Sequence, residues 1–205
     1  MIYPKHIPQI IKPFGKHLCF DIPNENNQIY LTFDDGPHPE ITLWTLDLLE
    51  KFEAKATFFL IGENAIRYPE ILVRIKNEGH AIGNHTMKHI SGWKTSNRDY
   101  LDQVHDCNSL IKSDLFRPPY GQITHSQSVE LKDDYKIIMW SDLSADFDPK
   151  VSVDECFHHA THKVKTGSII VFHDSEKAWP RLEKALPRCL EYYKGQSFNM
   201  SPIGF

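Results

Sequence analysis

Residues 28–37 read Gln-Ile-Tyr-Leu-Thr-Phe-Asp-Asp-Gly-Pro, an apolar run that ends in two carboxylates and a turn. The run at 28–33 is typical of a buried strand, and Gly36 with Pro37 turns the chain after it. Adjacent carboxylates repel each other unless a cation lies between them. An Asp-Gly turn alone is more often structural than functional, so Asp34 and Asp35 need support from other parts of the chain.

Strand and helix patterns alternate on both sides of this run. We expect strands at 28–33, 56–61, 80–83, 115–117, 136–141, 168–173 and 197–200, and helices at 39–53, 69–77, 97–112, 126–131, 153–164 and 179–194. Asn97 is a possible N-cap. Such alternation predicts βα units and a mostly parallel sheet in an α/β protein. About seven units in a chain this short indicate a small distorted barrel or a wound open sheet.

Length and composition set the outer limits. The 205 residues suit one domain, which we place at 28–205, with residues 1–27 as an irregular N-terminal strap. A net charge of −4 argues against nucleic-acid binding or an anionic membrane surface. No run approaches the ~20 apolar residues of a membrane span. We also see no signal peptide and expect a cytoplasmic monomer, with export by another route left open.

Four cysteines, at positions 19, 107, 156 and 189, are widely and irregularly spaced. None belongs to a Cys-x-x-Cys pair, so the spacing of a structural zinc site is missing. We therefore expect free thiols.

Ionisable residues follow several of the expected strands. His85 and His89 are spaced i, i+4, so on one face of a helical turn they would converge on a metal ion. Imidazole suits zinc and its first-row neighbours, and Asp35 would complete a set of two histidines and one carboxylate with a position open for water. Arg117 leaves a strand end where a buried guanidinium needs a carboxylate, and Asp34 is the natural partner. His173 ends an apolar strand and suits a general acid.

The motifs at residues 32–36, 85–89, 117–120, 140–147 and 171–173 together resemble the polysaccharide deacetylase family, also called the NodB-homology domain or carbohydrate esterase family four. The resemblance covers about residues 27–200. It implies a distorted (β/α) barrel of about seven units and removal of N-acetyl groups from chitin oligomers or peptidoglycan, or of O-acetyl groups from xylan.

The same resemblance implies a role for each matching residue. Asp34 would be the catalytic base, held by Arg117, and His173 the acid. Asp35, His85 and His89 would bind the metal, most simply Zn²⁺, with Co²⁺, Ni²⁺ or Fe²⁺ as alternatives. The backbone N–H of Tyr120 would contribute to an oxyanion site. We also expect Trp140 and Val171 to wall a pocket for the acyl methyl group.

One motif departs from the family pattern. The family has Asp-Ser-x-Asp-Trp where this chain has Leu143-Ser-Ala-Asp146-Phe. Leu143 thus stands where an aspartate would support the histidine acid. Asp146, Asp148 or Asp142 can replace it, and we favour Asp146.

Two other readings of the function and one other histidine pair stay open. The same scaffold could deacylate or deformylate a lipid-linked sugar or hydrolyse a cyclic amide, and an inactive glycan-binding domain would have a similar sequence. His158 and His162 also form an i, i+4 pair, but the apolar face of their helix points elsewhere, so we expect both on the surface.

Overall fold

The computed structural model describes Lys5 and residues 16–204. The strands are β1 (Leu18–Cys19), β2 (Gln28–Asp34), β3 (Ala56–Leu60), β4 (Ala81–Asn84), β5 (Leu115–Phe116), β6 (Lys136–Ile138), β7 (Asp142–Leu143), β8 (Ile169–His173) and β9 (Asn199–Met200). The helices are α1 (Ile41–Lys51), α2 (Gly62–Arg67), α3 (Pro69–Asn77), α4 (Asn97–Ile111), α5 (His125–Leu131), α6 (Val153–Thr161) and α7 (Trp179–Gly195).

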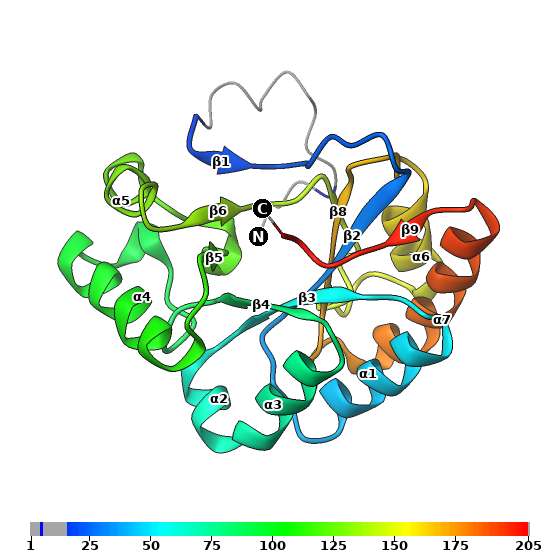
Figure 1. The fold of residues 1–205 in the computed structure, drawn as a ribbon, viewed down its shortest axis with the longest axis horizontal. Helices are drawn as coiled ribbons and strands as arrows, with labels where there is room; N and C mark the ends of the chain where they lie inside the picture. The colour runs from blue at the N-terminus through cyan, green and yellow to red at the C-terminus, as the bar shows by residue number, and fades with distance from the viewer. Residues whose placement is uncertain (1–4, 6–15, 205) are drawn as a thin grey trace.

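These strands form one parallel sheet in the order β1-β6-β5-β4-β3-β2-β8-β7, with β9 paired to β2. The sheet curls into a half-barrel with the helices on its outer side (Figure 1). β2 lies near its centre and is buried on both faces, as the apolar run predicts. The expected distorted α/β barrel is therefore confirmed.

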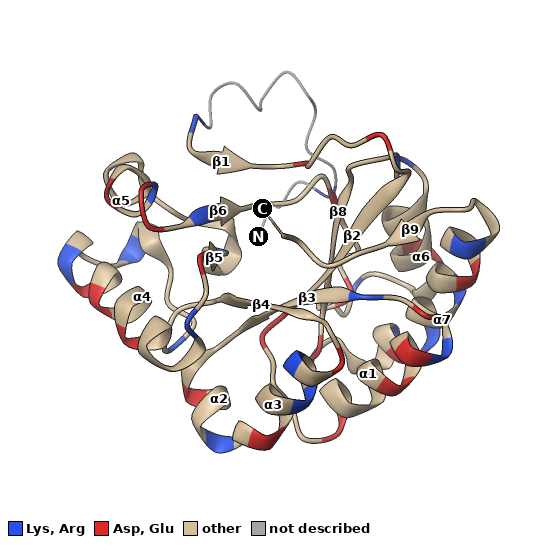
Figure 2. Cartoon of the chain, in the orientation of Figure 1, with Lys and Arg blue, Asp and Glu red and all other residues tan. Residues whose placement is uncertain are grey.

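The hydrophobic core lies between the central strands and the outer helices. It joins β2, β3 and β8 to α1, α3 and α7 through residues such as Leu31, Phe58, Leu46, Ile75 and Leu186. Lysine, arginine, aspartate and glutamate lie mainly on the outer helices, with both signs interspersed (Figure 2). Within the described residues, no helix is long and apolar enough to cross a membrane. None of the four cysteines, all of which lie within the described residues, forms a disulfide, as predicted.

The structure corrects several expected boundaries. Helix α2 and strand β7 were not predicted, because each is too short to show a period. Ser96, not Asn97, caps α4, and its side chain accepts a hydrogen bond from the Asp99 N–H. The predicted strap at 1–27 lies partly outside the described residues. Its described part is not wholly irregular, because β1 pairs with β6.

Candidate active site

The carboxyl ends of the central strands meet around a cleft of about 730 Å³. Strand register brings Asp34 at the end of β2 directly beside His173 at the end of β8. His85 follows the end of β4 and Arg117 follows the end of β5. The cleft is lined by Asp34, Asp35, His85, His89, Pro118, Tyr120, Gly121, Trp140, Leu143, Phe147, Asp148, Pro149, Lys150, Val171, His173 and Lys177. Eight of the ten predicted site residues thus line the cleft, and Arg117 and Asp146 are fully buried beside it.

Asp35, His85 and His89 form a compact set of metal-binding atoms. One atom from each lies within 4.8 Å of the others, and no other group of three or more such residues occurs in the described part of the chain. Nδ1 of His85 lies 2.7 Å from the Arg117 carbonyl oxygen. Since a carbonyl only accepts, Nδ1 carries the hydrogen and Nε2 keeps its lone pair. That Nε2 lies 3.8 Å from Oδ1 of Asp35, and Nε2 of His89 lies 3.1 Å from it.

The protonation states of Asp35 and His85, and an Asp35 oxygen that has no hydrogen-bond partner, fit a divalent cation. Burial lowers the pKa of His85 to about 4, so its imidazole is neutral near pH 7. Burial opposes ionisation of Asp35, but the imidazoles of His89, His173 and His85 hold its pKa well below the usual range. Oδ1 of Asp35 is buried and has no hydrogen-bond partner, whereas Oδ2 accepts one from Ser175 at 3.4 Å. A buried oxygen of this kind needs a partner, and a bound cation would supply it.

The two histidines do not project from a helical turn, contrary to our expectation. Residues 85–91 form a loop, with left-handed backbone at Thr86 (φ 64°) and His89 (φ 54°). Its peptide groups bond to neighbouring segments: Gly62 N–H donates to the Thr86 carbonyl, and Met87 N–H donates to the Gln103 carbonyl. These contacts replace the i→i+4 bonds of a helix while the two rings still converge, with centroids 5.0 Å apart.

Two residues that were not predicted for the site, Asn64 and Asp174, fix the conformation of Asp35. The Asp35 backbone is left-handed, with φ 80°, which costs energy in a residue other than glycine. The Asn64 side chain donates to the Asp35 carbonyl at 2.9 Å, and Oδ1 of Asp174 accepts from the Gly36 N–H at 3.1 Å. Burial raises the pKa of Asp174 to about 8. Asp174 directly follows His173, so its sequence position could have indicated a role in the site. Asn64 lies on helix α2, which was not predicted, and no sequence pattern connects it to the site.

Arg117 holds Asp34 through the expected ion pair, with Nη1 2.7 Å from Oδ1. The guanidinium is fully buried and also donates to Thr32 Oγ1 and to the carbonyls of Ile138 and Met139. Its flat face lies 4.1 Å from the Phe59 ring centroid. Burial lowers the pKa of Arg117, and Asp34 opposes this effect. Asp34 therefore lines the cleft while Arg117 fixes its Oδ1.

His173 is held by Asp146, the carboxylate that we favoured. Oδ1 of Asp146 lies 2.7 Å from Nδ1 of His173, and Oδ2 accepts from the His173 backbone N–H at 2.8 Å. Burial lowers the pKa of His173, but Asp146, together with the charges of Asp35 and Asp34, outweighs this effect and raises the pKa to about 9. The leucine at 143 therefore does not leave the histidine unsupported. Leu143 instead packs with Trp140 and Val171 in one apolar cluster.

We predict that Asp146→Asn lowers the pKa of His173 by more than one unit from its value of about 9, because the opposing charge is lost while burial remains. Histidine NMR titration of metal-free protein measures this, and His173→Gln identifies the signal. The raised pKa also predicts that the stability lost in Asp146→Asn is largest below pH 6.5 and shrinks as the pH rises towards 9. A His173 titration that stays near 9 in the variant would refute the assignment.

Trp140, Leu143 and Val171 form an apolar wall, which depends on the close approach of the Gly121 backbone to the Trp140 ring. Trp140, Val171 and Leu143 are almost fully buried and line the cleft. Gly121 has φ 65°, and a Cβ there would lie 2.5 Å from Cη2 of Trp140, so only glycine fits. Tyr120 also has left-handed backbone (φ 61°), and the hydroxyl of this half-exposed residue lies 3.2 Å from Nδ1 of His89.

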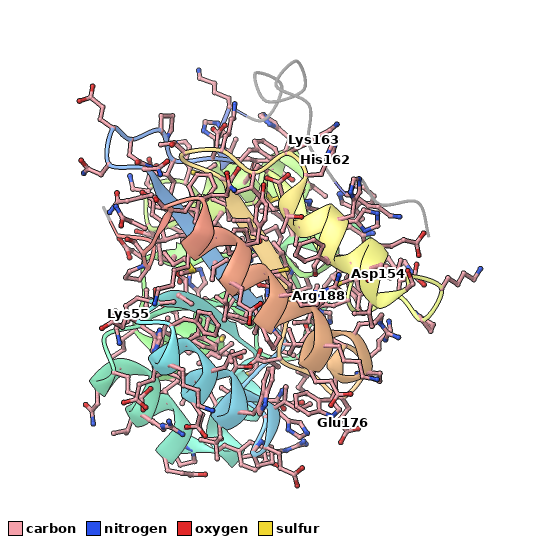
Figure 3. All side chains as sticks on the ribbon, turned by 90° about the vertical axis from the view of Figure 1, so that its right-hand side faces the viewer. Lys55, Asp154, His162, Lys163, Glu176 and Arg188 are labelled. Carbon is pink, nitrogen blue, oxygen red and sulfur yellow. The ribbon has the colours of Figure 1, made fainter. Side chains whose placement is uncertain are left out.

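The second histidine pair is on the surface, as predicted. His158 and His162 are exposed and stack on each other, with ring centroids 4.5 Å apart. His162 follows the carboxyl end of α6, away from the strand ends that bear the site (Figure 3).

Known proteins resemble this chain in sequence and in fold. The family model for polysaccharide deacetylase matches residues 21–136. A peptidoglycan-N-acetylglucosamine deacetylase of Bacillus cereus is 33% identical over 203 residues, covering 94% of this chain and 93% of that protein. A chitooligosaccharide deacetylase of Azorhizobium caulinodans is 32% identical over 161 residues, covering 75% of this chain and 76% of its own.

The fold is similar to a solved structure of the same kind. The crystal structure of the Bc1960 peptidoglycan N-acetylglucosamine deacetylase superposes with a TM-score of 0.84 at 32% identity, covering 94% of each chain. The family match, the near full-length relative and the shared fold lead to one conclusion. This chain belongs to the polysaccharide deacetylase family.

Proposed function

We propose that this protein is a metal-dependent hydrolase that removes acetyl groups from N-acetylated sugars in a carbohydrate polymer or oligomer. One observation carries the proposal: Asp34, fixed by Arg117, lies beside the Asp35-His85-His89 set, and His173 lies next to it across the strand register. A base, a cation site and an acid around one cleft are what hydrolysis of an amide requires.

Each side chain has a separate task in this proposal. Asp35, His85 and His89 would hold a divalent ion, which would supply Lewis-acid polarisation of the acetyl carbonyl and acidify water. Asp34 accepts the proton of the attacking water. His173, charged near pH 7 because of Asp146, donates a proton to the leaving nitrogen, which otherwise departs very poorly.

The remaining predicted residues position the acyl group. We propose that the Tyr120 backbone N–H donates to the developing oxyanion, a contact worth about 3–4 kcal/mol in comparable sites. Trp140, Leu143 and Val171 present an apolar wall of a kind suited to a methyl group. Two imidazoles with one carboxylate favour Zn²⁺, with Co²⁺, Ni²⁺ or Fe²⁺ as alternatives.

The names of the relatives support an N-acetylglucosamine-containing substrate. One is called a peptidoglycan-N-acetylglucosamine deacetylase and another a chitooligosaccharide deacetylase. A competing activity on formamido sugars or cyclic amides would use the same base and cation site.

A substrate panel separates these possibilities. Purified protein supplied with Zn²⁺ is incubated with chitin oligomers, peptidoglycan, acetylxylan, a formamido sugar and a cyclic amide, and acetate, formate or ring opening is measured. We expect acetate from the first two. Turnover of the formamido sugar or the cyclic amide alone would replace the proposed substrate class, and glycan binding without any turnover would make the protein an inactive binding domain.

A further inference from the structure

The two rims of the cleft differ in charge. One rim, formed after β4 and β5, includes His89, Pro118 and the exposed Tyr120. The other rim, formed between β7 and α6 and between β8 and α7, contains Lys150 and Lys177. Among the described residues that line the cleft, Lys150 and Lys177 are the two lysines, and none is an arginine.

Both ammonium groups are available to a ligand. Lys150 and Lys177 are exposed, and neither forms an ion pair with any residue in the described ranges 5 and 16–204. Nζ of Lys177 lies 5.4 Å from the Phe147 ring centroid, and that ring lies 4.9 Å from the His173 ring. The ammonium group of Lys177 therefore lies within the length of a disaccharide from His173, the proposed acid.

The acidic groups nearby do not cancel this charge. Asp34 is paired with Arg117, and Asp35 belongs to the cation site. Glu176 precedes Lys177 but lies 3.5 Å from His38, outside the cleft lining. In the part of the chain that the structure describes, Asp148 is the one carboxylate that lines the same rim. With a divalent cation at Asp35, two lysines face a single acid there, so the rim favours an anion.

Building on the proposed function, we infer that Lys150 and Lys177 form a subsite for a carboxylate that the substrate carries on, or next to, the acetylated sugar. A neutral chitin oligomer has no group that uses two ammonium ions. A glycan with a lactyl ether or a uronic acid beside the acetamido group does. Tyr120 on the opposite rim offers an exposed aromatic ring to a sugar face, so the two rims together would orient an acidic glycan.

A matched substrate pair isolates the charge. The first pair is an oligosaccharide of N-acetylglucosamine and N-acetylmuramic acid with its lactyl carboxylate free or converted to the amide. The second pair alternates N-acetylglucosamine with glucuronic acid, again free or amidated. Acetate release gives kcat/KM for each, in low salt and in about 0.5 M salt, where exposed charges are screened.

We expect the wild type to prefer the free acid of one pair by roughly three- to tenfold at low salt, since each exposed ion pair contributes only a few-fold. High salt should remove most of this preference. The double variant Lys150→Gln, Lys177→Gln should bring the ratio of free acid to amide close to one. The control Lys163→Gln makes the same charge change beyond the far end of α6 and should keep the wild-type ratio (Figure 3).

The outcomes test the carboxylate subsite separately from the proposed hydrolase activity. Equal rates on acid and amide in the wild type, or a preference that survives in the double variant, would overturn the subsite. Equilibrium binding of the same pairs is measured alongside. Binding that favours the free acid and needs both lysines, without acetate release, would support the subsite and refute the hydrolase.

Discussion

Asp34→Asn is expected to lower kcat for acetate release by about 10²–10⁴-fold, the usual contribution of a positioned general base. The substitution keeps the shape of the side chain but removes the charge that accepts a proton from water. Asp35, His85 and His89 are untouched, so the metal content of the purified variant should equal that of the wild type. Acetate release under single-turnover conditions and metal analysis on the same sample measure both effects.

The matched control for this variant is Asp47→Asn, which makes the same chemical change on the outer surface of α1, where Asp47 is exposed. It should retain wild-type turnover. If Asp34→Asn kept a rate near that of the wild type, Asp34 would not be the base. Loss of metal from the variant would instead place Asp34 in the cation site.

Arg117→Met should reduce the free energy of unfolding by about 3–5 kcal/mol, the typical cost of removing one partner of a buried ion pair. Arg117 is fully buried, and its loss leaves the Asp34 carboxylate and the carbonyls of Ile138 and Met139 without their donor. Methionine keeps much of the apolar contact with Phe59. Denaturant unfolding of metal-free protein, followed by circular dichroism, measures the change.

A double-mutant cycle separates the ion pair from the packing. Asp34→Asn with Arg117→Met removes both charges, so the double variant should be less destabilised than the sum of the single variants. Strict additivity would show that the two residues do not interact energetically. Arg188→Met is the surface control, because Arg188 pairs with the exposed Asp154, and it should cost no more than about 1 kcal/mol (Figure 3).

Much of the site was predictable because parallel strands place their carboxyl ends along one edge. Asp34, His85, Arg117 and His173 each directly follow or end an apolar run, so the topology alone brings them together. The Arg117–Asp34 pair followed from the need of a buried guanidinium for a carboxylate. The resemblance added the division into base, acid and metal ligands.

The remainder depended on contacts between segments that are distant in sequence. The left-handed backbone of Asp35 is held by Asn64 and Asp174, which no local pattern connects to it. The His85–His89 segment was expected to be helical, yet its backbone bonds to Gly62 and Gln103 instead.

The sequence left Asp142, Asp146 and Asp148 as replacements for the aspartate missing at 143, with Asp146 favoured. In the structure Asp146 contacts His173 and Leu143 joins the apolar wall. The path of the segment between β7 and α6 decides among the three carboxylates, because it sets which one reaches Nδ1 of His173.

Acetate release from an N-acetylglucosamine oligomer, measured against bound metal, tests the central claim most directly. The protein is stripped with a chelator, and Zn²⁺ is returned in steps. We predict that the stripped protein is inactive, that activity rises in proportion to bound metal up to one ion per chain, and that His85→Gln neither binds the ion tightly nor regains activity. Acetate release at the full rate by metal-free protein, or one tightly bound ion without any acetate, would contradict the account.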